Sequence, residues 1–119
     1  MLAKLAVAFV ALLHLLFLVL EMFLWTKPFG RKTFGLSAEL AQATKGLAAN
    51  QGLYNGFLAA GLVWGLVTEG AEGFSIRVFF LVCVLVAGLF GAATAKRSIL
   101  YIQALPAAVA LALVWLTRG

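Results

Sequence analysis

Residues 5–25 read LAVAFVALLHLLFLVLEMFLW, and this stretch decides the fold. Within it, only His14 and Glu21 carry strongly polar side chains. The hydrocarbon core of a bilayer is about 30 Å thick, and a helix needs roughly 20 apolar residues to cross it. The stretch is too long for a strand and shows no alternation of polar and apolar residues. Residues 5–25 therefore predict a membrane-spanning helix.

Further apolar stretches of similar length follow, and they predict three more spans at about residues 47–68, 76–95 and 99–116. Hydrophobic residues make up 65% of the chain and charged residues 11%. An average soluble domain is about 45–50% apolar and about 25% charged. The composition therefore excludes an ordinary soluble enzyme, a disordered tail and a disulfide scaffold. We expect an all-α, integral membrane four-helix bundle that forms a single domain over residues 1–119.

The basic residues predict how the spans are oriented. With four spans, both termini lie on one side, which then carries three basic residues: Lys4, Arg77 and Arg118. The other side carries six: Lys27, Arg31, Lys32, Lys45, Lys96 and Arg97. Because loops rich in Lys and Arg stay in the cytoplasm, we expect a multi-pass protein of the cell (inner) membrane with both termini outside the cytoplasm. We also expect an acidic turn over residues 69–73 on that outer side. The net charge of +5 then belongs to loops beside the lipid bilayer, and we expect no nucleic-acid partner.

The segment between the first two spans carries local signals. Pro28 and a following glycine predict a turn over residues 26–32. Ser37 is a good N-cap residue for a helix that begins after it. Because the chain then lacks proline as far as position 106, we expect one uninterrupted helix over about residues 38–68. Its first two turns should project into the cytoplasm, and Gly46 is its weakest point.

Polar residues inside the predicted spans are the candidates for function, because lipid excludes them unless they are paired or hydrated. On the first span, His14 and Glu21 are seven residues apart and share a helix face. The second span begins with four hydrogen-bonding side chains within two turns, and the fourth span begins with two more before Pro106. These residues are Asn50, Gln51, Tyr54, Asn55, Tyr101 and Gln103.

His14 is predicted near the middle of the bilayer and the other positions nearer the cytoplasm, so we expect these side chains to converge in the cytoplasmic half of the membrane. They should form a polar pocket open to the cytoplasm or the inner leaflet. His14, Glu21 and Tyr54 are candidate catalytic residues, because each can give or take a proton. Asn50, Gln51, Asn55, Tyr101 and Gln103 are candidate substrate-binding residues. We predict that Glu21 points inward and contacts Asn50, Gln51, Tyr54 or Tyr101, directly or through water.

Three functions stay open at this point. The first is an enzyme or binding protein that acts by acid–base chemistry on a small lipophilic molecule. The second is a proton-coupled exporter of small molecules, which would use one membrane-embedded glutamate, and the third is a structural or assembly subunit. The sequence indicates no cofactor, and one histidine and one cysteine on different spans give no metal site. Glycines four residues apart, such as Gly52 and Gly56, allow close helix packing within the chain or in a homo-oligomer, either a dimer or a trimer.

The segments 14–25, 30–36 and 49–56 resemble the DUF1304 family of small bacterial membrane proteins, and the resemblance covers nearly the whole chain. It implies a four-helix integral membrane protein and no particular activity. The chain is also loosely similar to the MAPEG membrane proteins, and Asn50 and Tyr54 match the second helix of that family. This similarity implies a cytoplasm-facing site in a trimer. The acidic residue that MAPEG proteins carry between those two positions is absent here.

Overall fold

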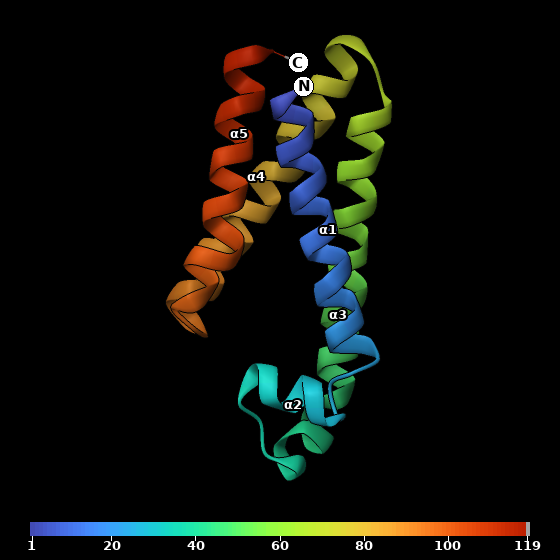
Figure 1. Cartoon of the computed structure of the whole chain (residues 1–119), viewed down its shortest axis with the longest axis vertical. Helices are drawn as coiled ribbons and strands as arrows, with labels where there is room; N and C mark the ends of the chain where they lie inside the picture. The colour runs from blue at the N-terminus through green and yellow to red at the C-terminus, as the bar shows by residue number, and fades with distance from the viewer. Residues whose placement is uncertain (119) are drawn as a thin grey trace. The chain divides into compact units, whose positions relative to one another are not determined.

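Five α-helices and one π-helical turn make up most of the computed structural model, which describes residues 1–118 (Figure 1). Those residues contain no strand, which confirms the prediction of an all-α chain. The elements are α1 (Leu2–Met22), α2 (Pro28–Phe34), α3 (Ala38–Val67), α4 (Gly70–Thr94), the π-helical turn η1 (Leu100–Ala104) and α5 (Leu105–Thr117).

Three helical stretches are long and apolar enough to cross a membrane: Leu2–Met22, Gly70–Thr94 and Leu100–Thr117. They correspond to the first, third and fourth predicted spans. α3 is the longest helix, with 30 residues, but it is not among the three. The physical reason is its run of Asn50, Gln51 and Asn55, which lowers the mean hydropathy over the predicted second span.

The described chain divides into two compact units. Met1–Leu12 and the chain from Leu58 onward form one, here called the terminal unit, and Leu13–Phe57 forms the other, the middle unit. The core of the terminal unit takes side chains from α1, α3, α4 and α5. Its buried members are Ala3, Val7, Val10, Ala11, Leu62, Leu81, Val84, Ala107, Ala110 and Val114. Small residues are frequent among them, which lets the helix backbones approach closely.

The turn η1 begins the last helical stretch and is explained by Pro106. The Leu105 N–H donates to the carbonyl of Leu100, five residues back, where a regular α-helix would use the residue four back. A proline ring collides with the carbonyl four residues before it, and proline has no N–H to donate. The wider turn moves that carbonyl out of the way, so the helix continues through the proline.

Residues 28–34 form α2, so the prediction that residues 26–32 form only a turn is wrong. Pro28 occupies the first turn of the helix, where its missing N–H costs nothing and its fixed φ suits the helix. Gly30 is buried within α2, and a Cβ there would collide with the Leu24 carbonyl oxygen. The helix ends at Gly35, whose φ of +66° favours glycine.

The predicted start and continuity of the long helix are confirmed. The Leu40 N–H donates to Ser37 Oγ at 3.1 Å, which is the expected N-cap contact. α3 then runs from Ala38 to Val67 without a break and passes through Gly46.

The acidic turn expected over residues 69–73 is wrong, because α4 already begins at Gly70. Gly70 has a φ of +72°, which allows the chain to reverse between α3 and α4 within a few residues. Arg77, which the sequence places at the start of a span predicted from residue 76, therefore lies two turns inside α4.

Candidate functional site

α1 carries two buried polar side chains. His14 is fully buried and Glu21 is 8% exposed, which agrees with the prediction that Glu21 points away from the surface. The His14 ring packs edge-to-face against Phe17, with the ring centroids 5.2 Å apart. Burying polar groups this completely costs free energy unless they are hydrogen-bonded, so the partners of these side chains matter.

The carboxyl group of Glu21 has its hydrogen-bond partner on α3, within the middle unit. Asn55 Nδ2 donates to Glu21 Oε1 over 2.6 Å. The bond joins residues 34 positions apart in the chain, and it is short for an amide donor. Asn55 was among the expected substrate-binding residues, but the structure places it at the carboxylate, where we had expected Asn50, Gln51, Tyr54 or Tyr101.

Two glycines explain why Asn55 takes this place. A Cβ on Gly52 would lie 2.6 Å from Met22 Cγ and 3.1 Å from Glu21 Cβ, and one on Gly56 would lie 2.7 Å from Leu18 Cδ1. α3 therefore presents its glycine side to α1. Asn55 lies on that same side, because residues three and four apart share a helix face.

The other polar residues of α3 lie on the exposed side of the helix. Asn50, Gln51 and Tyr54 are all exposed, and Asn50 Nδ2 donates to the Tyr54 hydroxyl at 3.2 Å. Asn55 therefore lies with the glycines of α3, apart from these three exposed side chains. The exposed residues remain available to a ligand.

A second polar contact holds the connection between α1 and α3. Trp25 Nε1 donates to Thr44 Oγ1 at 3.0 Å, and the Trp25 ring also packs on Phe34 of α2. The Thr44 hydroxyl donates in turn to the Leu40 carbonyl at 2.7 Å. Thr44 was not predicted to matter, and the sequence offers no signal that distinguishes it from the polar residues beside it, Gln42 and Lys45.

Tyr101 and Gln103, the remaining predicted site residues, belong to the terminal unit. Tyr101 is exposed, whereas Gln103 Nε2 donates to the Val84 carbonyl of α4 at 3.1 Å. Gly88 allows this close approach, since a Cβ there would lie 2.9 Å from the Ala104 nitrogen. Gln103 therefore ties η1 to α4.

Arg77 is a buried charged residue that the sequence analysis did not select. It is 3% exposed, and its Nη1 donates to the Gly65 carbonyl at 2.6 Å. Gly65 lies in the last turn of α3, where carbonyls lack helical partners and the helix dipole favours a cation. The predicted span, residues 76–95, put Arg77 at its very start, so Arg77 was counted only among the basic residues of the outer side and not as a buried group.

The middle unit contains three predicted side chains that can exchange protons: the Glu21 carboxyl group, the His14 imidazole and the Tyr54 phenol. Asn55 donates to the carboxyl group and Asn50 donates to the phenol, so the structure pairs Glu21 and Tyr54 with different amides. Within residues 1–118, no group of three His, Cys, Asp or Glu side chains is placed to hold a metal ion.

Comparison with known proteins gives the family. The model of a family described as "Protein of unknown function (DUF1304)" matches residues 8–115. The chain belongs to this family, as its resemblance had indicated. No curated protein and no solved structure matches the chain, so the similarity to the MAPEG proteins is not shown.

Proposed function

We propose that this member of the DUF1304 family is a multi-pass inner-membrane protein that binds a small lipophilic molecule and acts on it by acid–base chemistry. The single observation that carries the proposal is the partly buried Glu21–Asn55 pair, with its 2.6 Å hydrogen bond and its carboxyl group on a helix apolar enough to span a membrane. An ionisable residue inside a span is costly and most often functional. The pair is not needed for close packing of α1 and α3, because Gly52 and Gly56 beside it already allow that.

The roles within the site follow from exposure. Glu21 is held in place by Asn55 and its carboxyl group can give or take a proton, so we assign it proton transfer. Tyr54 and Asn50 are exposed and joined to each other, so they can meet a ligand that arrives from the lipid or the membrane surface. Gln51 is exposed on the same stretch of helix and can orient a polar group of the ligand.

In the proposed arrangement α3 also crosses the membrane, as the second of four spans, and four helices form the bundle. The polar run on α3 is tolerated in lipid because Asn55 is paired with Glu21 and Asn50 with Tyr54. The segment from Lys27 to Lys45, which holds α2, lies at the cytoplasmic surface, and both termini lie outside the cytoplasm. Alkaline phosphatase fused after the last residue should be active, since it works only outside the cytoplasm. If this fusion were inactive, and a reporter that fluoresces only in the cytoplasm were fluorescent at the same position, the termini would lie in the cytoplasm and the proposed orientation would be wrong.

A proton-coupled exporter is the second candidate, and the buried carboxyl group on α1 favours it. Transport through such a protein would require Glu21 to exchange protons with both sides of the membrane. The two functions differ in one measurement. Proteoliposomes of the full chain with an imposed pH gradient should move a lipophilic cation if the protein is an exporter, and should not if it acts as an enzyme.

The test of the main proposal compares two substitutions that each replace a carboxyl group by the uncharged amide of glutamine. Lipophilic molecules that co-purify with the full-length protein are extracted and identified by mass spectrometry, and then supplied to purified variants. Glu21→Gln should keep the fold and the hydrogen bond from Asn55 but lose any conversion of the molecule. Glu39→Gln changes an exposed carboxylate at the start of α3 and should behave as the wild type. Full conversion by Glu21→Gln, with circular dichroism unchanged, would refute the role of Glu21.

A further inference from the structure

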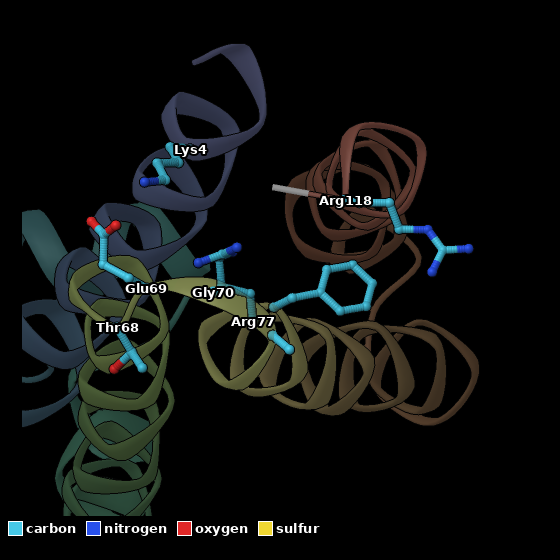
Figure 2. Close-up of a pocket in the computed structure, with 8 residues that line it drawn as sticks. Lys4, Thr68, Glu69, Gly70, Arg77 and Arg118 are labelled. Carbon is cyan, nitrogen blue, oxygen red and sulfur yellow. The ribbon is translucent and has the colours of Figure 1, made fainter.

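A cavity of about 450 Å³ lies in the terminal unit, beside the start of α4. Figure 2 shows the side chains around it coming from separate helices: Lys4 from α1, Arg77 from α4 and Arg118 from the end of α5. Thr68 and Glu69 of the α3–α4 connection also line it. None of the residues of the proposed acid–base site belongs to its lining, so it is a separate feature.

The lining of the cavity is strongly cationic. Its lining includes three basic residues, Lys4, Arg77 and Arg118, and one carboxylate, that of Glu69. Arg77 is nearly fully buried and fixed by its bond to the Gly65 carbonyl, so its charge cannot swing out into water. Lys4 and Arg118 are exposed and can adjust to a ligand. A fixed guanidinium accompanied by two exposed basic side chains is suited to an anion, and arginine in particular matches phosphate.

The cavity also lies where the apolar helices end. Lys4 is in the first turn of α1, Arg118 directly follows α5, and the cavity borders the first residues of α4. These are the ends of all three helices that are apolar enough to cross a membrane. The Arg118 guanidinium lies 5.0 Å from the centroid of the Trp115 ring and 5.8 Å from that of Phe74. Aromatic rings combined with basic residues are typical of the headgroup level of a bilayer.

We propose that this cavity binds a phosphate group, and that the ligand presenting it is an anionic phospholipid of the surrounding bilayer. Arg77 provides the fixed positive charge, and Lys4 and Arg118 close on the phosphate oxygens. The aromatic side chains of Phe74 and Trp115 lie against the glycerol and upper acyl chain. This assignment relies on the membrane insertion proposed above, but it is independent of the chemistry at Glu21.

Native mass spectrometry of the full-length protein in a non-ionic detergent tests the proposal. Phosphatidylglycerol and phosphatidylcholine are titrated separately, and the bound lipid is counted. Phosphatidylglycerol should bind more tightly, because the choline cation opposes the basic lining. The double variant Lys4→Gln/Arg118→Gln should weaken phosphatidylglycerol binding by about tenfold or more, as expected when two basic side chains at a membrane surface are lost. Both residues are exposed, so the fold should be kept, which circular dichroism would verify.

The matched control removes two charges elsewhere in the terminal unit. Lys96→Gln/Arg97→Gln changes exposed residues that follow α4, and it should leave lipid binding as in the wild type. Inorganic phosphate at millimolar concentration provides the other arm: displacement of the lipid assigns the site to free phosphate, and no displacement assigns it to the lipid headgroup. The proposal is overturned if the Lys4/Arg118 variant binds phosphatidylglycerol as the wild type does, or if the control loses as much. Because the readout is lipid retention, an inactive Glu21 site does not affect it.

Discussion

The hydrogen bond between Glu21 and Asn55 should contribute measurably to the stability of the fold. Hydrogen bonds between helices in membrane proteins couple by about 0.6 kcal/mol on average, with a maximum of about 1.7 kcal/mol. The Glu21–Asn55 bond is short, at 2.6 Å, and partly buried, with a carboxyl acceptor, and these features all strengthen a hydrogen bond. We therefore expect a coupling free energy of about 1–1.7 kcal/mol, in the upper part of that range.

A double-mutant cycle measures this coupling. Glu21→Ala, Asn55→Ala and the double variant are unfolded with increasing sodium dodecyl sulfate in mixed micelles, and helix content is followed by circular dichroism. The matched cycle uses Asn50→Ala and Tyr54→Ala, whose bond is 3.2 Å long and exposed. Pairs on an exposed helix surface contribute about 0.2–0.5 kcal/mol. If the coupling free energy of Glu21–Asn55 were no larger than that of Asn50–Tyr54, the partly buried pair would contribute no more to stability than an exposed one, which would contradict this expectation.

Three further predictions use the same unfolding measurement. Arg77→Met should lower the free energy of unfolding by about 1.5–3 kcal/mol, because it removes a charged hydrogen bond at the end of α3. The control Arg97→Met, at an exposed position, should change it by less than about 0.5 kcal/mol, and equal effects of the two substitutions would contradict the role of Arg77. Gly30→Ala should lower the free energy of unfolding by about 1–3 kcal/mol, because the new Cβ meets the Leu24 carbonyl. Gly46→Ala, with no atom near its Cβ, should raise it by about 0.5–1 kcal/mol, and stabilisation by both substitutions would show that α2 packs differently. Ser37→Ala should cost about 1 kcal/mol through loss of the N-cap of α3, and no loss would mean that another group caps the helix.

The features that the sequence predicted well are decided by residues close together in the sequence. Ser37 and the absence of proline after it predicted the start and the continuity of α3, because capping and helix continuation are decided within a few residues. Pro28 was misinterpreted for a related reason. Proline ends a helix when it lies inside one but begins a helix when it lies in the first turn, and the short helix after it had no strong pattern of its own.

The features that the sequence did not predict depend on how helices are rotated against each other. Asn55 lies at the carboxyl group of Glu21 because Gly52 and Gly56 set which side of α3 packs on α1. Counting residues gives the depth of a side chain along a helix but not its rotation relative to a partner. Arg77 was missed because the start of α4 was placed six residues too late, so a cation two turns inside the helix was expected at the membrane surface.

The wide turn at Leu100–Ala104 also bears on how the length of this family's chains can vary. A π-helical turn holds one more residue than an α-helical turn, so removing one residue from it leaves the following helix in register. Ala107, Ala110 and Val114 would then still face the core, whereas the same deletion within α5 would rotate them by about 100°. The shortened turn would, however, bring a carbonyl against the ring of Pro106. Relatives that lack one residue in this turn should therefore carry a different amino acid in place of Pro106, so that the deletion and the substitution occur in the same sequences.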